Sequence, residues 1–175
     1  MSVLDYKKVE KEKTGDNHSE TSDDHGDRLS PDCLNKPNLT EAQVIPFLFA
    51  LFQKEGAIVS QYYGHIEKGA DMALWIDPLT NSLGNPILVE VKIGHLTEPR
   101  LLLAEEQLRH YLITTSVQSG LLLYLDVEKK TFGRSTNDSP LIVRLDIREL
   151  INRLEKQSLV QILLSERDAM VHLRG

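Results

Sequence analysis

The run NPILVEVKIG at residues 85–94 places two charged side chains, Glu90 and Lys92, near the end of a stretch that is otherwise apolar and β-branched. Successive side chains in a strand point to opposite faces, so Glu90 and Lys92 share a face with Leu88 and leave the other face to the odd-numbered residues. Buried charges are costly unless they pair with each other or bind a metal ion. The pattern therefore fits either an exposed edge strand with an ion pair or part of a metal-dependent phosphodiesterase site.

Hydrolysis of a phosphodiester bond needs a Lewis acid, a positioned water molecule and neutralisation of the charge that builds on the phosphoryl oxygens. Mg²⁺ (or Mn²⁺) held by one or two carboxylates can meet the first need, and a nearby lysine can orient the water and stabilise the anion. Asp71 begins the preceding apolar run, ADMALWID, and antiparallel pairing of the two runs would bring it beside Glu90. The carbonyl of Val91, between Glu90 and Lys92, is a further candidate metal ligand.

Hydrophobic periodicity and turn residues predict the elements that must position these side chains. A first helix is expected from the capping box of Thr40 and Gln43 to Gly56, with Pro46 either kinking it or marking its first turn. The segment PLTNSLGN is rich in turn residues and predicts that the second and third strands form an antiparallel hairpin. The expected strands cover residues 57–66, 70–77, 86–93, 120–127 and 140–147, and two further helices cover 98–117 and 147–168.

This order of elements predicts an α/β fold with three layers, in which helices cover both faces of a central mixed β-sheet. The predicted domain spans residues 39–175, whereas residues 1–38 are polar and acidic and predict a disordered N-terminal arm. The formal net charge is −6, with −3 in each part. Such a charge disfavours tight, unaided, non-specific DNA binding, but it does not exclude a nucleic-acid enzyme, because the local field matters more than the total.

Composition narrows the class of protein further. No apolar stretch is long enough to span a membrane, and the N-terminus has no apolar signal segment. The single cysteine, Cys33, excludes an internal disulfide, so a cytoplasmic protein without membrane contact is expected. The histidines show no zinc-binding spacing, and there is no GxxxxGK[ST] phosphate loop.

Three motifs follow one another on the elements, and in the order, that a known family has: Asp71, then Glu90-Val91-Lys92, then Gln107 and Tyr111. In these motifs the sequence resembles the PD-(D/E)XK nuclease superfamily, which has the restriction-endonuclease-like fold. The glutamine and tyrosine look like the QxxxY motif of its RecB-like branch and would lie one turn apart on a helix. The resemblance covers about residues 40–145, and it departs from the pattern where alanine, not proline, precedes the aspartate.

The resemblance implies roles for the matching residues. Asp71 and Glu90 would bind Mg²⁺ or Mn²⁺, Lys92 would be the catalytic lysine, and Gln107 and Tyr111 would shape the site or contact the nucleic-acid backbone.

Two acidic positions stay open. Members of this superfamily often add an acid from the first helix, for which both Glu41 and Glu55 are available. Asp77 could replace Asp71 as a ligand, although Asp77-Pro78 is more simply the start of a turn.

The expected function is that of a metal-dependent nuclease, with DNA favoured over RNA, in a defence, repair or recombination setting. The alternative is an inactive nuclease-fold module that binds nucleic acid or protein within a larger complex. Because the domain is small and contains no evident DNA-reading module, we expect a homodimer or a partner subunit that supplies targeting. Endonuclease and exonuclease action both remain open.

Overall fold

A computed structural model describes residues 34, 36, 38–63, 69–135 and 140–172. The N-terminal arm expected over residues 1–38 therefore lies almost wholly outside the described residues. The strands are β1 (Ile58–Tyr63), β2 (Ala70–Trp75), β3 (Ile87–Gly94), β4 (Ser119–Asp126) and β5 (Leu141–Asp146). The helices are α1 (Glu41–Lys54), the 3₁₀ turn η2 (Asp77–Leu79), α2 (Thr80–Leu83), α3 (Glu98–Thr115), α4 (Ile147–Leu154) and α5 (Leu159–His172).

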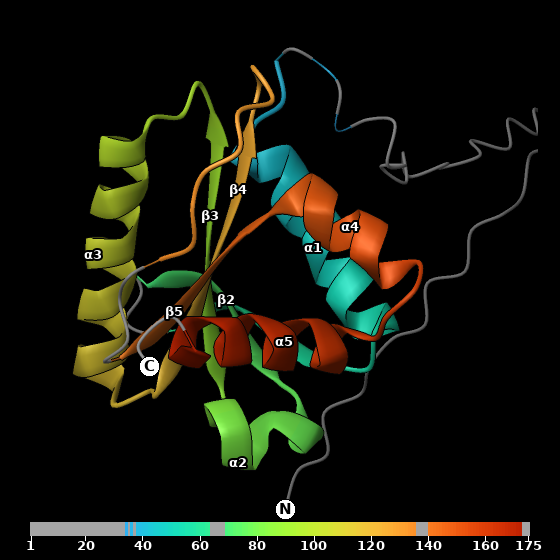
Figure 1. The fold of residues 1–175 in the computed structure, drawn as a ribbon, viewed down its shortest axis with the longest axis vertical. Helices are drawn as coiled ribbons and strands as arrows, with labels where there is room; N and C mark the ends of the chain where they lie inside the picture. Colours follow the sequence, from blue (N-terminus) through green and yellow to red (C-terminus); the bar gives the residue numbers. More distant parts are fainter. Residues whose placement is uncertain (1–33, 35, 37, 64–68, 136–139, 173–175) are drawn as a thin grey trace, which may run out of the picture.

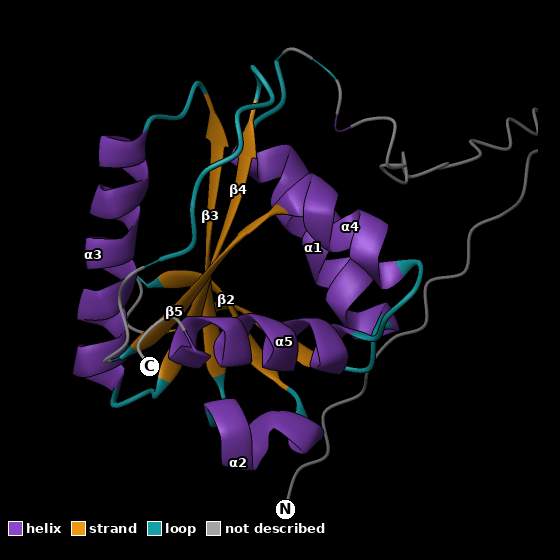
Figure 2. Cartoon of the chain, in the orientation of Figure 1, coloured by secondary structure: helices purple, strands orange, loops and turns teal. Residues whose placement is uncertain are grey.

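The five strands form one mixed sheet in the order β1-β2-β3-β4-β5. Strand β2 is antiparallel to both of its neighbours, β1 and β3, whereas β3, β4 and β5 run parallel to one another. Helix α3 covers one face, and α1, α4 and α5 lie on the other (Figures 1 and 2). The prediction of an α/β fold with helices around a mixed sheet is confirmed, as is the antiparallel pairing of the second and third strands.

Alternation along β3 divides the core into two parts. Ile87, Val89 and Val91 pack with the α1, α4 and α5 side, and Leu88 packs with the α3 side. The strand is buried from its start through Val91 because helices cover both of its faces. The even-numbered residues of β3 therefore belong to the α3 face.

Helix α1 begins as its sequence predicts. The backbone amide of Thr40 donates to Oε1 of Gln43 at 3.1 Å, which forms half of a capping box. Pro46 lies inside this helix, and Val44, Leu48 and Phe52 form its buried stripe.

The prediction of one final helix over 147–168 is wrong, because two helices, α4 and α5, occupy this range and α5 continues to His172. The side chain of Asp146 caps α4, accepting from the backbone amides of Arg148 and Glu149. A second cap starts the next helix, where Ser158 and Gln161 exchange hydrogen bonds at 2.9 and 3.3 Å. The break lets the apolar stripes of both helices reach the same core, whereas one straight helix would carry its second half away from the sheet.

The connection between β2 and β3 also differs from a simple turn. Its residues form η2 and α2 (Figure 1), and Oδ1 of Asn85 accepts the backbone amide of Ile76 at 3.0 Å to close the connection. Within the described residues, no helix combines the length and the apolar character needed to cross a membrane.

Candidate active site

The β2–β3 ladder ends beside the charged residues of β3. Its pairs are Leu74–Ile87, Ala73–Leu88 and Met72–Val89, and the next position along β2 is Asp71. There the Asp71 carboxylate replaces a backbone partner, because its Oδ2 accepts the backbone amide of Val91 at 2.8 Å.

This bond also orients the Val91 carbonyl. The amide and carbonyl of one strand residue point to the same side, so the Val91 carbonyl faces the side on which Asp71 lies. The end of the ladder thus gathers a carboxylate and a carbonyl oxygen between two diverging strands.

Glu90 and Lys92 lie on the α3 face of β3, as alternation predicts. Nζ of Lys92 donates to Oε1 of Glu90 at 2.7 Å. Glu90 is 2% exposed, whereas the Lys92 side chain is 27% exposed. The second carboxylate oxygen of Glu90, Oε2, is buried and has no hydrogen-bond partner among the described residues. A buried acceptor without a partner is costly, so this oxygen is where a cation or a donor would be most favourable.

The structure distinguishes the two acids of the first helix. Oε1 of Glu41, in the first turn of α1, lies 3.9 Å from Nζ of Lys92. Glu55 is the C-cap at the other end of the same helix. A helix of 14 residues is about 21 Å long, so Glu55 cannot reach the site at which Glu41 lies.

Burial disfavours ionisation of the acids at the site. Burial raises the pKa of Glu90 to about 7, and the nearby Asp71 carboxylate adds to the effect, while the Lys92 ammonium opposes it. Burial also raises the pKa of Asp71, against the hydrogen bond from Val91 and the charge of Lys92. Burial alone would lower the pKa of Lys92, but its hydrogen bond to Glu90 and the surrounding acids outweigh burial and raise it.

Gln107 and Tyr111 lie one turn apart on α3, the helix that covers the face of Glu90 and Lys92. Nε2 of Gln107 donates to the Tyr111 hydroxyl at 2.7 Å, and the Tyr111 ring packs against the core on that side. The hydrogen bonds of the described residues join Gln107 and Tyr111 to each other, and none joins them to the acids or to Lys92.

Asp77 does not join the site. It begins η2, beyond the end of β2 opposite to Asp71, and its carbonyl accepts from the Thr80 hydroxyl at 2.9 Å. Within the described ranges, no group of three or more His, Cys, Asp or Glu side chains forms a metal cage. The candidate ligand set is therefore two carboxylates and one carbonyl, which suits a hard cation that keeps several waters.

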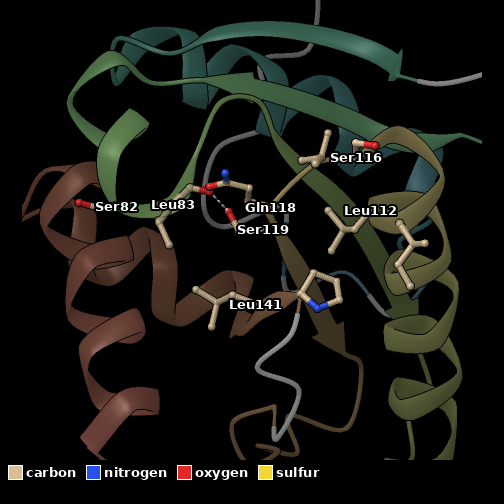
Figure 3. A pocket seen from close by; sticks show the side chains of 10 residues that line it. Ser82, Leu83, Leu112, Ser116, Gln118, Ser119 and Leu141 are labelled. Atoms are coloured by element: carbon tan, nitrogen blue, oxygen red, sulfur yellow. Dashed lines mark hydrogen bonds between the residues drawn. The ribbon is translucent and has the colours of Figure 1, made fainter.

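A pocket of about 480 Å³ lies at the opposite end of the sheet, near the starts of β4 and β5 (Figure 3). Leu83, Leu112, Gln118 and Leu141 are among its walls, and its described lining includes no charged side chain. The Ser119 hydroxyl donates to the Leu83 carbonyl there. This pocket lacks the groups that phosphodiester hydrolysis requires, so the site on β2 and β3 remains the candidate for chemistry.

A second buried charge cluster, which the sequence does not predict, also lies on the α3 face. We call it the Arg144 network, and its members are Arg144, Glu98, Glu105, Ser135 and the Gly133 carbonyl. Nε of Arg144 donates to Glu105 at 2.7 Å, and its Nη1 donates to Glu98 at 2.6 Å. The signal in the sequence was a single arginine within the apolar run LIVRLD, but nothing in that run names its partner.

Comparison with protein-family models, with curated proteins and with solved structures finds no match. The geometry of the site therefore carries the functional argument.

Proposed function

We propose that this chain is a metal-dependent nuclease of the PD-(D/E)XK type, with a restriction-endonuclease-like arrangement of sheet and helices, and that it hydrolyses phosphodiester bonds in DNA. One observation carries the proposal: Asp71 ends the β2–β3 ladder on the Val91 amide, next to a Glu90–Lys92 pair in which one glutamate oxygen has no described partner. The motif order in the sequence adds support.

The residues present fit a divalent cation. Asp71, Glu90 and the Val91 carbonyl would hold Mg²⁺ or Mn²⁺, and a positive charge there would relieve the repulsion that helps to raise the pKa of Glu90. When bound, the ion would supply a Lewis acid and lower the pKa of an attacking water. Glu41 lies near enough to influence the same charges.

Lys92 has the position and charge to act on the substrate. Its side chain is partly exposed while its Nζ is held by Glu90, so the ammonium can donate to a water or to a phosphoryl oxygen without leaving the site. A fixed cation aimed at the developing negative charge stabilises the transition state more than the ground state. Gln107 and Tyr111, on the covering helix, are candidates for contacts with the nucleic-acid backbone.

The alternative is an inactive module of the same fold that binds nucleic acid or protein. The net charge of −6 favours this alternative, because many lysine and arginine contacts are usual in proteins that hold DNA alone. The set of Asp71, Glu90 and Lys92 favours the enzyme. A homodimer or a partner subunit would reconcile the enzyme with the acidic charge by supplying targeting, and light scattering that shows an efficient monomeric nuclease would contradict this part of the proposal.

A cleavage assay tests the function. Purified protein with Mg²⁺ or Mn²⁺ is incubated with linear, circular and single-stranded DNA and with RNA, and Lys92→Ala is compared with wild type and with an EDTA control. We expect Lys92→Ala to lower the cutting rate about 100- to 1000-fold, the cost of losing one preorganised donor.

Lys54→Ala is the matched control, since Lys54 is an exposed lysine at the far end of α1, and it should cut as wild type does. Folded wild-type protein that binds DNA but cuts none of these substrates would contradict the enzyme and favour the inactive module. Circular DNA that is cut would identify internal cleavage.

A further inference from the structure

A second pocket, of about 500 Å³, is lined by the loop after β4, helix α4 and the segment that follows it, and by Asp146 at the carboxyl end of β5. We call it the β5-end pocket. Its nine described lining residues are Lys129, Thr131, Asp146, Arg148, Glu149, Asn152, Arg153, Lys156 and Gln157. Four of them are basic and two are acidic, so the lining is net positive in a chain whose formal net charge is −6.

The two acids of the pocket are already engaged. Oδ1 of Asp146 accepts the backbone amides of Arg148 and Glu149 at 2.7 and 3.3 Å. The Glu149 carboxylate accepts from Nη1 of Arg153 at 3.3 Å. Neither acid therefore offers a free carboxylate that would repel an anion as strongly as its formal charge suggests.

The cations of the pocket differ in how they are paired: Arg153 pairs with Glu149 and Glu166, and Arg148 lies 4.0 Å from Asp146. Lys129 and Lys156 are exposed, and among the described residues no ion pair involves either of them. Arg148 donates through Nη2 to the Asp126 carbonyl at 3.0 Å, which fixes its guanidinium, while its Nε is buried and has no hydrogen-bond partner in the described part of the chain. A fixed guanidinium in a pocket that two exposed lysines also line matches the oxygens of a phosphate.

The pocket and the candidate active site occupy the same end of the parallel strands. Lys92 pairs with Tyr124 across β3 and β4, and Tyr124 pairs with Asp146 across β4 and β5. Lys92 therefore lies two strand spacings, about 10 Å, from Asp146 at the edge of the pocket. A DNA strand with one phosphate at Lys92 can therefore place another phosphate of the same backbone at the pocket.

We infer that the β5-end pocket binds a backbone phosphate of the DNA substrate, close to the bond that is cut. The inference rests on the proposed function and extends it, because it identifies a positively charged place at which the acidic chain binds the substrate. The carboxyl ends of parallel strands are also a common location for ligands in α/β sheets.

Binding can be measured without cutting, which separates this inference from the nuclease proposal. Fluorescence anisotropy of a labelled 20-nucleotide DNA, as single strand and as duplex, is recorded with Ca²⁺ in place of Mg²⁺ over a range of salt. Lys129→Gln and Lys156→Gln are tested singly and together. Each phosphate contact contributes about 0.9 to the salt slope for duplex DNA, so each substitution should weaken binding about eightfold at 0.1 M salt and the pair should lower the slope by about 1.8.

Two controls make the result specific. Lys54→Gln removes the same charge outside the pocket and should leave the affinity unchanged, and the double variant Lys129→Arg/Lys156→Arg should restore it. An unchanged affinity and salt slope in the double glutamine variant would overturn the inference, even if wild type cuts DNA. Weaker binding in that variant would support it, even if wild type cuts nothing. No measurable binding of DNA by wild type would overturn it as well.

Discussion

Two places on the α3 face of the sheet bury a carboxylate beside a cation. They differ in how many oxygens of that carboxylate accept a hydrogen bond. In the Arg144 network, Oε1 of Glu105 accepts from Arg144 and Oε2 accepts from the Ser135 hydroxyl at 3.0 Å. In the candidate active site, Lys92 satisfies one oxygen of Glu90, and the other has no described partner.

The difference separates a structural charge pair from one prepared for a ligand. The Arg144 side chain is 2% exposed and that of Glu105 is 0% exposed, and both oxygens of Glu105 accept a hydrogen bond, so this network is closed around Glu105. Glu90 is equally buried, but a second carboxylate repels it and an oxygen is left over. A buried polar atom without a hydrogen-bond partner persists in folded proteins mainly where a ligand or a reaction makes use of it.

Breaking the Arg144 network should have the largest effect on stability. Arg144→Leu leaves Glu105 as a buried charge without its cation, and the loss of one partner from such a pair costs about 3–5 kcal/mol. Urea unfolding should therefore show a decrease of this size in the free energy of unfolding.

The matched variants sharpen the contrast. Arg144→Leu/Glu105→Leu should recover most of the loss, since a buried ion pair can be replaced by apolar groups at little cost. Lys92→Ala should cost much less than Arg144→Leu at pH 6, because Glu90 has a raised pKa and can take a proton when its cation is removed. Equal losses in Lys92→Ala and Arg144→Leu would abolish the distinction between the two places.

The next largest effect is the pH dependence that Glu90 gives to the free energy of unfolding in the absence of divalent metal. The pKa of Glu90 rises from 4.5 to about 7 on folding, so the folded state binds more protons than the unfolded state between these values. Stability should therefore fall as the pH rises from about 4.5 to about 7, by up to about 3 kcal/mol at about 1.4 kcal/mol per pKa unit. Asp71, whose pKa is also raised, contributes in the same direction.

Glu90→Gln isolates this contribution. In EDTA it should be more stable than wild type at pH 8, with the difference vanishing near pH 5, whereas Glu105→Gln should be less stable than wild type at pH 8. Chemical denaturation at several pH values measures both. A Glu90→Gln protein that is less stable than wild type at pH 8 would show that Glu90 is a satisfied structural residue.

Sequence alternation was sufficient to place Glu90 and Lys92 on one face of β3, because a strand has only two faces and the apolar neighbours define them. The antiparallel hairpin followed from the turn residues, although they form short helical turns instead of a simple loop. The final helix was mispredicted because its apolar spacing continues across the break, while the cap of Ser158 and Gln161 that restarts it was overlooked.

Longer-range contacts could not be predicted in this way. The choice between Glu41 and Glu55 depends on which end of α1 lies at the site, and periodicity does not give the direction of a helix over a sheet. Arg144 and Glu105 are 39 residues apart and meet only after α3 has packed on the sheet. The β5-end pocket likewise combines a loop and a helix whose association is a tertiary event.

Metal binding should stabilise the fold through the candidate active site and not through the Arg144 network. Mg²⁺ or Mn²⁺ at a hundredfold excess over its dissociation constant would stabilise the fold by about 2.7 kcal/mol, which thermal unfolding would show as a rise in Tm. The rise should be larger at pH 8 than at pH 6, because the cation must displace the proton of Glu90 at the lower pH. Asp71→Asn and Glu90→Gln should abolish the rise, and Ser135→Ala should retain it. A rise that survives both substitutions would place the metal elsewhere.

The smallest effect on stability is expected from the third polar pair of the α3 face, Gln107 and Tyr111, which is neither charged nor fully buried. Tyr111→Phe removes one partly exposed hydrogen bond, which is worth about 0.5–1.5 kcal/mol at most. Its effect on cutting should be larger than its effect on folding if the hydroxyl contacts the DNA backbone, with a rise in KM of about tenfold.

Thr114→Ala is the matched control for that substitution, because the Thr114 hydroxyl makes an exposed hydrogen bond to the His110 carbonyl on the same helix. It should change stability by a similar amount and leave KM unchanged. If Tyr111→Phe changes stability alone, the Gln107–Tyr111 pair is a structural feature like the Arg144 network. The candidate active site is then confined to β2, β3 and the start of α1.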